Sequence, residues 1–486
     1  MRLDQSLSAA LARGFDGPVN PWRHLGALTH WTLVVTLASG IVTYALYDTS
    51  IDGAYQSGLR LQNDTTGMGP LLRGLHRYGA DAFMLLLLVH AVREFLRGHH
   101  RGARWFSWVS GVPLVWLAWA AGLTGLWLLW DARALMSVTA TAEWMQALPL
   151  VGDGIVRNFL LPGALNDRFF SLIMFLHIGL PLLLLGATWT HLQRIRLPVI
   201  WPAPAARYGF TALLALLALF VPAKSLGLAD AHFVPALLSI DWWFQWPHAL
   251  VEATSGGAVW WAAGLTTLAL CALPWLDRPA RTPPVAVVDP VNCNGCSRCA
   301  ADCPTGAIRM VARTDARRHA RQAEVDANLC VSCGICVGAC PSATPFRRIE
   351  ALVSGIELPH QPVDALRSAL TRAQAANDPR DCVLVCHCTP AGMVIAADQR
   401  RVPIALECAG MLPPSFIDYA LRQGFAGVVV AGCGECDCAY RLGDRWTVER
   451  LNGEREPHLR RIVPRERVTV LWGATPTTVT HAANAL

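Results

Sequence analysis

The chain has 486 residues, of which 53% are hydrophobic and only 16% are charged. This composition is typical of a protein with a large membrane part, and the length allows about three domains. The formal net charge of +6 is small for this length, so we do not expect the chain to bind nucleic acid. We expect no secretory signal peptide, because residues 1–17 lack an apolar core of the required length.

Six apolar runs between residues 18 and 276 are long enough, or nearly long enough, to cross a bilayer as helices. The fifth run is the short one. We therefore predict a six-helix transmembrane bundle in a domain of residues 1–276, with helices over residues 25–47, 75–97, 107–130, 169–192, 208–222 and 257–276.

Basic residues are distributed unevenly between the two sides of this predicted bundle. One side carries Arg2, Arg13, Arg23, Arg93, Arg97, Arg101, Arg104, Arg194, Arg196 and Arg207. The opposite side carries fewer, namely Arg60, Arg73, Arg133, Arg157, Arg168 and Lys224. The excess predicts that the N-terminus lies in the cytoplasm, and six crossings then return the chain to the cytoplasm near residue 277.

Two of the predicted helices each carry two histidines that are 14 residues apart. The second helix has His76 and His90, and the fourth has His177 and His191. Fourteen residues are close to four turns, so both histidines of a pair share a face, about 21 Å apart along the axis. A single histidine in a membrane helix is usually packed or hydrogen-bonded, but this matched spacing favours ligation of two stacked b haems.

Glycines in the first and third predicted helices have the same spacing of 14 residues. A flat macrocycle that lies against a helix needs a position without a side chain. Each glycine pair alone is also typical of ordinary packing between membrane helices. The spacing shared with the histidines favours haem contact for Gly26, Gly40, Gly111 and Gly125.

With these histidines and glycines, residues 20–276 resemble cytochrome b of the bc-type quinol-oxidising complexes, shortened to six helices. Arg73 and Arg93, each three residues from a histidine, match arginines that pair with haem propionates in that family. The resemblance implies quinone or quinol as a reactant, and a homodimer. With the N-terminus in the cytoplasm, the second and fourth predicted helices run from the outside to the inside. His76 and His177 would then hold the outer haem, and His90 and His191 the inner haem.

The family's quinol-site signature, P-E-W-Y, aligns here with residues 240–244, which read I-D-W-W-F. The resemblance therefore places Asp241 at an outer quinone site, where a carboxylate can exchange a proton with a quinone oxygen. An aspartate that caps the following helix is the alternative. A histidine that is common in the family six residues after the last haem ligand is Leu197 here, which leaves the existence of an inner quinone site open.

Residues 277–290 contain four prolines and are predicted to form a stiff linker. Residues 291–350 then contain two copies of the pattern C-x2-C-x2-C-x3-C-P. This spacing holds [4Fe–4S] clusters, with three thiolates from one copy and the fourth from the other. One cluster is predicted to take Cys293, Cys296, Cys299 and Cys340, and the other to take Cys330, Cys333, Cys336 and Cys303.

This region resembles a bacterial two-cluster ferredoxin, which implies a small α+β domain that relays electrons. Zinc knuckles or disulfides are the alternatives, but eight cysteines at doubled spacing disfavour both. Gly295 and Gly334 suit tight turns in the two cysteine loops. We predict a hairpin from residues 307–313 and 323–326, and a connector over residues 351–380 with a helix at 363–376.

The last part, residues 381–486, has β-rich runs and is predicted to be an α/β domain with a parallel sheet. The runs cover residues 383–385, 404–406, 427–431 and 468–472, and a helix is predicted at 413–423. Three runs lead directly into cysteines, and the carboxyl ends of parallel strands meet at one edge of a sheet. This favours one metal site over separate buried thiols.

The motifs E-C-A-G-M-L-P-P and G-C-G-E-C-D-C-A-Y make this last region similar to the [2Fe–2S] delta subunit of methyl-viologen-reducing hydrogenases. The resemblance implies electron transfer with a dehydrogenase or a heterodisulfide-reductase flavoprotein. The first element differs from the family's C-x2-C, and Cys436 is an additional thiol. The ligands that we favour are Cys388, Cys408, Cys433 and Cys438, with Cys386 as a substitute.

Together these parts predict a multi-pass electron-transfer protein of the bacterial cytoplasmic membrane, with its iron–sulfur domains in the cytoplasm. It would connect a cytoplasmic flavoprotein or dehydrogenase with quinone through one [2Fe–2S], two [4Fe–4S], the inner b haem and the outer b haem. The sequence contains no G-x-G-x-x-G or P-loop motif, so NAD chemistry would belong to the partner. The alternative is a redox-active anchor that mainly recruits a soluble dehydrogenase or heterodisulfide-reductase-like complex.

Overall fold

The computed structural model describes residues 7–486 except 9, 12–13, 16–18, 149–164, 231, 233–237, 278–283, 316, 377 and 435–436. Part of the predicted linker and the residues Arg2, Arg13, Arg157 and Cys436 therefore lie outside the described residues. The chain divides into two compact units. The first comprises Met1–Gln193 and Pro198–Arg278, and the second comprises Arg194–Leu197 and Pro279–Leu486.

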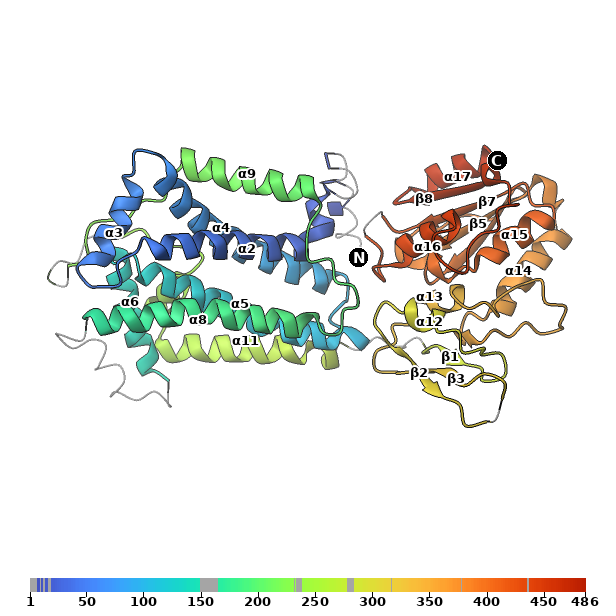
Figure 1. Ribbon diagram of the computed structural model, residues 1–486, viewed down its shortest axis with the longest axis horizontal. Coiled ribbons are helices and arrows are strands. Elements are labelled where there is room, and N and C mark those ends of the chain that lie inside the picture. The colour runs from blue at the N-terminus through green and yellow to red at the C-terminus, as the bar shows by residue number, and fades with distance from the viewer. Residues whose placement is uncertain are drawn as a thin grey trace. The chain divides into compact units, whose positions relative to one another are not determined.

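Long helices that run side by side dominate the first unit (Figure 1). Each apolar run of the sequence forms one of them: α2 (Leu25–Ala45), α4 (Met68–Leu96), α5 (Trp105–Trp127), α8 (Asp167–Leu192), α9 (Pro204–Phe220) and α11 (Gly256–Leu276). Helix α4 packs against α2 and α9, and α5 packs against α8 and α11. The helices that carry paired histidines are thus each packed against a helix that carries paired glycines.

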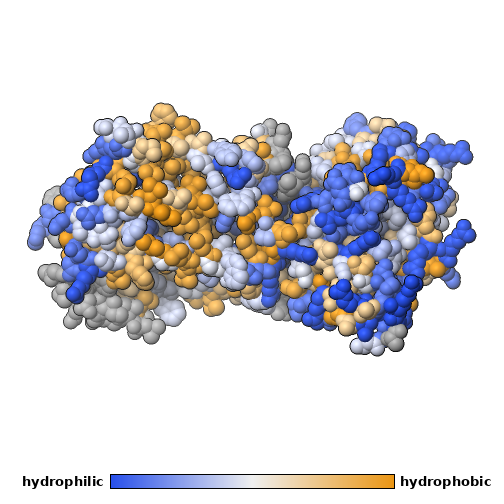
Figure 2. All heavy atoms as spheres, viewed as in Figure 1, coloured by the Kyte–Doolittle hydropathy of each residue, from blue (hydrophilic) through white to orange (hydrophobic). Residues whose placement is uncertain are grey.

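The first unit is that of a multi-pass membrane protein. Among the described residues, four helical segments are long and apolar enough to cross a membrane, namely Pro21–Ala45, Gly102–Trp127, Asp167–Leu192 and Gly256–Leu276. Helix α9 has 17 residues, and the 29-residue α4 contains several charged side chains, so six crossings stay a prediction. Phe175 and Phe220 are 73% and 80% exposed, and apolar side chains gather on the surface of this unit (Figure 2), as lipid contact requires.

Short helices that were not predicted from the sequence lie directly before α2 and in the segments that connect the long helices. They are η2 (Pro21–His24), α3 (Gly53–Gln62), η3 (Gly102–Arg104), α6 (Ala132–Gln146) and α10 (Trp246–Ala253). Side-chain caps mark the N-terminal ends of several helices. Asp131 accepts a hydrogen bond from the Ala134 N–H of α6, and Asn166 accepts one from the Arg168 N–H of α8. Such caps satisfy N–H groups that have no partner within the helix.

The second unit begins with two short antiparallel pairs. Strand β1 (Val287–Val288) pairs with β4 (Ile356–Glu357), and β2 (Ile308–Ala312) pairs with β3 (Arg321–Val325) as the predicted hairpin. Each cysteine loop leads into one turn of helix, α12 (Arg298–Ala301) after the first loop and α13 (Ile335–Gly338) after the second.

The rest of the second unit contains a four-stranded parallel sheet in the order β6-β5-β7-β8. Every residue of the two central strands is buried, as expected for a parallel sheet that is covered on both faces. The elements are β5 (Val383–Cys388), β6 (Arg401–Leu406), β7 (Gly427–Gly432), β8 (Val468–Trp472), α14 (Val363–Ala376), α15 (Pro414–Arg422), α16 (Gly443–Asn452), α17 (Pro476–Asn484) and the single turns η4 (Pro379–Asp381), η5 (Thr389–Ala391), η6 (Ala409–Met411) and η7 (Arg465–Arg467).

Candidate electron-transfer sites

The first pair of histidines from α4 and α8 faces each other within the helical unit. The ring centroids of His76 and His177 are 6.0 Å apart. This separation fits one metal ion that lies about 2 Å from one nitrogen of each ring. Nδ1 of His76 lies 2.9 Å from the carbonyl oxygen of Thr36, and Nδ1 of His177 lies 3.0 Å from that of Ala121. A carbonyl only accepts, so each Nδ1 donates and each Nε2 keeps the lone pair that a metal ligand needs.

The second pair, His90 and His191, lies at the other level of the same helices. Nδ1 of His191 is 3.2 Å from the Ser110 hydroxyl, and Nδ1 of His90 is 4.0 Å from the Glu94 carboxylate. The rings of His90 and His191 are close enough for their charges to interact. Buried apolar side chains from positions between the two histidine levels form one cluster, which contains Leu33, Phe83, Met84, Leu87, Leu114, Ala118 and Leu184.

Each of the four glycines that share this spacing faces one histidine ring. A Cβ on Gly40 would lie 2.8 Å from Cε1 of His76, and a Cβ on Gly125 would lie 2.8 Å from Cε1 of His177. The corresponding distance is 3.3 Å from Gly26 to His90 and from Gly111 to His191. The missing side chains of these glycines make room for the imidazoles, and contact of the glycines with a haem macrocycle stays a prediction.

The two arginines expected near haem propionates are both buried. Arg73 donates to the Gly58 carbonyl at 2.9 Å and to the Ser225 hydroxyl at 2.7 Å. Its charge interacts with that of the buried Asp131, and its contact with a haem propionate stays a prediction. Arg93 donates to Glu94 at 3.1 Å.

Asp241 is buried in a turn before α10. Its Oδ1 accepts hydrogen bonds of 3.0 Å from the N–H groups of Trp243 and Phe244, and its other oxygen pairs with Arg77. Asp241 therefore caps this turn, whereas the N-cap of α10 is Gln245, without a side-chain cap, so the alternative of a helix cap differs from the structure. The place of Asp241 at a quinone site stays a prediction. Arg77, which also lies 3.3 Å from Asp81 on α4, was not predicted from the sequence, because charges inside an apolar run cannot be paired without the tertiary fold.

The first predicted [4Fe–4S] ligand set is brought together in the second unit. Burial and, to a smaller extent, the neighbouring thiols of Cys340, Cys296 and Cys293 together raise the pKa of the Cys299 thiol to about 12. In both cysteine loops the residues on either side of the second cysteine have a positive φ. In each loop one of these two residues is a glycine and the other is a serine. The first loop has Gly295 before and Ser297 after the cysteine, and the second loop has Ser332 before and Gly334 after it.

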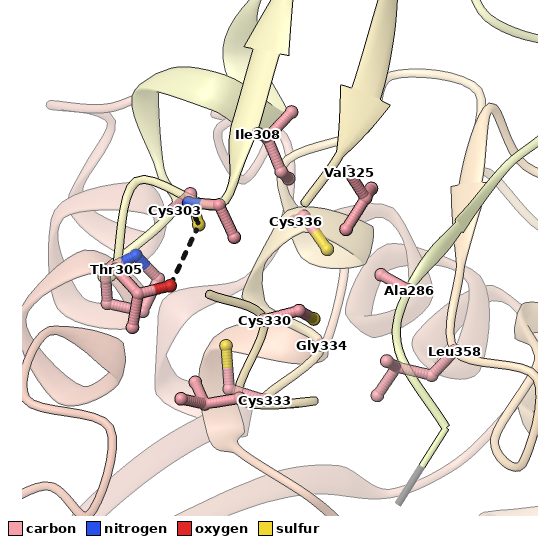
Figure 3. A pocket seen from close by; sticks show the side chains of 13 residues that line it. Ala286, Cys303, Thr305, Ile308, Val325, Cys330, Cys333, Gly334, Cys336 and Leu358 are labelled. Carbon is pink, nitrogen blue, oxygen red and sulfur yellow. Dashed lines mark hydrogen bonds between the residues drawn. The ribbon is translucent and has the colours of Figure 1, made fainter. Parts of the chain in front are cut away.

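The second predicted ligand set lines a single cavity. Figure 3 shows Cys303, Cys330, Cys333 and Cys336 around this cavity, and its empty space is about 330 Å³ including the part open to solvent. The thiol of Cys303 accepts a hydrogen bond of 3.1 Å from the Ala307 N–H. Backbone N–H groups that are aimed at sulfur favour bound thiolates over free thiols.

The C-terminal thiols meet at the carboxyl edge of the parallel sheet. Hydrogen bonds from Cys408 and Cys433 hold the pKa of Cys388 well below its usual value, and Cys438 in turn contacts Cys408 and Cys433. The structure thus brings together the four favoured cysteines. Cys386 is buried within β5, two residues before Cys388, and interacts with no other thiol among the described residues.

None of these sites has the geometry of a single-ion site. Among the described residues, no three His, Cys, Asp or Glu side chains converge closely enough to hold one metal ion. Thiolates of an iron–sulfur cluster bind different irons and lie farther apart than the ligands of one ion.

Comparisons with known proteins divide the chain into three matched regions. Residues 14–198 match the family "Cytochrome b/b6/petB". Residues 292–344 match "4Fe-4S dicluster domain", and residues 382–484 match "Methyl-viologen-reducing hydrogenase, delta subunit".

Individual relatives match the N-terminal part. The "Menaquinol:cytochrome c reductase cytochrome b subunit" of Geobacillus thermodenitrificans is 31% identical over 192 residues, which are 37% of this chain and 83% of that protein. The protein of the same description from Bacillus subtilis (strain 168) is 30% identical over the same shares. A solved chain from "Hyperthermophilic respiratory Complex III" is 19% identical, with a TM-score of 0.44 over 53% of this chain and 75% of that one.

Proposed function

Through its N-terminal part this chain belongs to the cytochrome b family and is a membrane electron-transfer subunit, and we propose that it connects a cytoplasmic flavoprotein or dehydrogenase with the quinone pool. The cytochrome b and dicluster matches imply haem b and [4Fe–4S] clusters. The match to a hydrogenase delta subunit supports a soluble redox partner. The excess of arginine on one side of the bundle supports a cytoplasmic N-terminus in a bacterial inner membrane, and the family supports a homodimer.

The paired contacts between glycine and histidine at two levels carry this proposal. His76 and His177 are proposed to bind the outer b haem, and His90 and His191 the inner one. A b haem that is held by two histidines exchanges single electrons. The Nδ1 hydrogen bonds of His76 and His177 orient both rings for ligation, and the buried charge of Arg73 supports a propionate contact.

The cysteines are proposed to hold three iron–sulfur clusters. Cys293, Cys296, Cys299 and Cys340 would bind one [4Fe–4S], and the cavity lined by Cys303, Cys330, Cys333 and Cys336 supports a second. The contacts among Cys388, Cys408, Cys433 and Cys438 support a [2Fe–2S] site at the sheet edge.

Asp241 is proposed to transfer protons at an outer quinone site. Its carboxylate is buried and shares Arg77 with Asp81, so three charged groups of the described turn and helix form one connected network. Quinone reduction consumes protons, and such a network can take up and release them.

The experiment that tests this function compares His177→Ala with the unmodified chain and with the control His458→Ala, whose side chain is half-exposed in the second unit. The iron–sulfur centres are reduced chemically, and oxidation of the centres by a soluble quinone analogue is followed. We expect oxidation of the centres by the quinone analogue to be lost in His177→Ala and unchanged in the control. Exchange at the parent rate in His177→Ala would contradict the proposal and favour the recruiting anchor.

A further inference from the structure

The second [4Fe–4S] ligand set lies directly beside the C-terminal thiols within the second unit. Cys333 and Cys438 are close enough for the charges of their thiolates to interact. Both belong to one buried cluster, which also contains Ile335, Cys408, Leu442 and Trp446. The second ligand set also adjoins the first [4Fe–4S] ligand set, because Cys336 and Cys299 are close enough for the charges of their thiolates to interact.

One buried arginine of α16 joins the loops that carry both ligand sets. Arg450 is 1% exposed and donates to the Gly410 carbonyl at 2.7 Å, two residues after Cys408. It also donates to the Ile335 carbonyl at 3.4 Å and pairs with Asp302, so it contacts the residues that precede Cys336 and Cys303. No hydrogen-bond partner of its Nε is found among the described residues.

Three glycines allow the loops to approach this closely. A Cβ on Gly338 of α13 would lie 2.1 Å from the Gly410 carbonyl oxygen and 2.7 Å from the Arg450 guanidinium. A Cβ on Gly410 would lie 3.3 Å from Gly443, and a Cβ on Gly443 would lie 2.1 Å from the Cys408 sulfur. Backbone therefore contacts backbone where the two loops meet, and the Arg450 side chain fills the remaining space.

Resting on the proposed function, we propose that Arg450 is a positioning residue that holds the second [4Fe–4S] site against the [2Fe–2S] site, so that these two centres exchange electrons directly. In each exchange one centre loses one electron and the other gains it, and no proton moves. The electron comes from a reduced flavin of the partner or from quinol. The [4Fe–4S] site of Cys293, Cys296, Cys299 and Cys340 then lies beyond the second site in this order.

The charge of Arg450 has a second consequence. A buried positive charge favours the reduced, more negative state of a neighbouring centre, and it does so more strongly than an exposed charge because solvent screens it less. Asp302 offsets part of this effect, but Asp302 is shared with Arg455, which donates to it at 2.7 Å. Arg455 in turn pairs with Glu449, so Arg450, Arg455, Asp302 and Glu449 balance one another, and removal of Arg450 alone would leave a net negative charge between the two sites.

The test uses the full-length membrane protein and two substitutions of one residue. Arg450→Met keeps the approximate length and removes the charge, whereas Arg450→Lys keeps the charge and loses the planar, multiply bonded head group. The control is Arg445→Met on the same helix. Arg445 pairs with Glu449 at the outer end of the same ion-pair network, but its side chain is 66% exposed, so solvent screens its charge. Iron and sulfide content, electron paramagnetic resonance of the reduced protein, and redox titrations of the clusters are measured for each.

In the unmodified chain we expect magnetic interaction between the reduced [2Fe–2S] signal and one [4Fe–4S] signal. Arg450→Met should weaken this interaction and make both centres at least tenfold harder to reduce, which is about 59 mV for one electron. Arg450→Lys should weaken the interaction while the reduction potentials stay near those of the parent. Arg445→Met should change neither quantity.

Parent-like interaction and potentials in Arg450→Met would overturn the inference. If that variant does not assemble its clusters, an unchanged interaction in Arg450→Lys would overturn it instead. A separate outcome concerns the proposed function: an unmodified chain that lacks [2Fe–2S] or [4Fe–4S] signals contradicts the function itself. An unmodified chain with all signals but no interaction between them contradicts the direct exchange between the two centres and leaves the proposed function standing.

Discussion

At the scale of single residues, the histidine sites depend on glycines that lack a side chain as much as on the imidazoles themselves. The imidazole of His76 occupies the place where a side chain at position 40 would begin. Its Nδ1 is fixed by the Thr36 carbonyl, so the ring has little freedom to move away from a new neighbour. The same restriction applies to His177, between Gly125 and the Ala121 carbonyl.

We predict that Gly40→Ala displaces the His76 ring and abolishes or weakens binding of the outer haem. The added methyl group would lie 2.8 Å from Cε1, and overpacking of this kind costs about 1–3 kcal/mol. Haem content and reduced-minus-oxidised spectra check the loss. The control is Gly186→Ala on α8, where an added Cβ meets nothing within 4 Å, and this variant should keep the parent spectrum.

Asp241→Asn tests proton transfer at the same scale. The amide keeps an oxygen for the Trp243 and Phe244 N–H groups, so the turn should persist, but it loses the negative charge that faces Arg77. We expect haems and clusters to stay spectroscopically intact, while steady-state quinone exchange falls by about 10²–10⁴-fold, the range for loss of a proton-transfer group. Turnover at the parent rate would show that the quinone reacts elsewhere.

At the scale of elements, two pairs of packed helices place the histidines at two levels. Helices α2 and α4 form one pair and α5 and α8 the other, and each pair combines a glycine helix with a histidine helix. The spacing of 14 residues in each helix repeats the contact about 21 Å further along the axis. The apolar cluster around Phe83 and Leu114 separates the two levels, so loss of a ligand at one level should leave the other intact.

His90→Ala should therefore remove only the inner haem. The substitution leaves the ring contact between His76 and His177 unchanged, because these residues lie at the other level. We expect about half of the b-type absorbance to remain in reduced-minus-oxidised spectra. Two haems per chain in this variant would contradict the assignment of His90, and loss of both would contradict the independence of the two levels.

At the scale of the whole molecule, the chain combines a membrane unit with a polar unit that gathers three thiol sets. Fifteen free cysteines are described, and twelve of them belong to these sets. Free thiols at cluster spacing are typical of a reducing compartment, which agrees with the proposed cytoplasmic side. The second unit is compact across all three sets, so the clusters would be held by one folded body.

Metal analysis tests this composition. Two [4Fe–4S] clusters and one [2Fe–2S] cluster correspond to about ten irons per chain beyond haem, with a similar amount of acid-labile sulfide. We expect these contents in protein that is prepared without oxygen, and we expect chelation of the iron to destabilise the second unit, because the clusters crosslink its loops. Zinc in place of iron, or iron without sulfide, would refute the three clusters.

The sequence alone determined the parts that depend on local pattern. Apolar runs predicted all six long helices because membrane helices need continuous apolar length, and α14 occupies residues 363–376 as predicted. The alternation of strands and helices predicted the parallel sheet, since parallel strands need crossover connections. Cysteine spacing predicted the thiol sets, because three ligands of each [4Fe–4S] set lie in one loop.

Tertiary structure alone decided what depends on contacts between distant segments. The set of Cys388, Cys408, Cys433 and Cys438 was one choice among several in the sequence. The thiols of this set meet at the carboxyl ends of β5, β6 and β7, whereas Cys386 lies two residues before the end of β5. The pairing of Arg77 with Asp241 joins residues 164 positions apart. Arg450 showed no motif, and its position between two cysteine loops follows from the packing of α16, where burial of a charge requires partners from several segments at once.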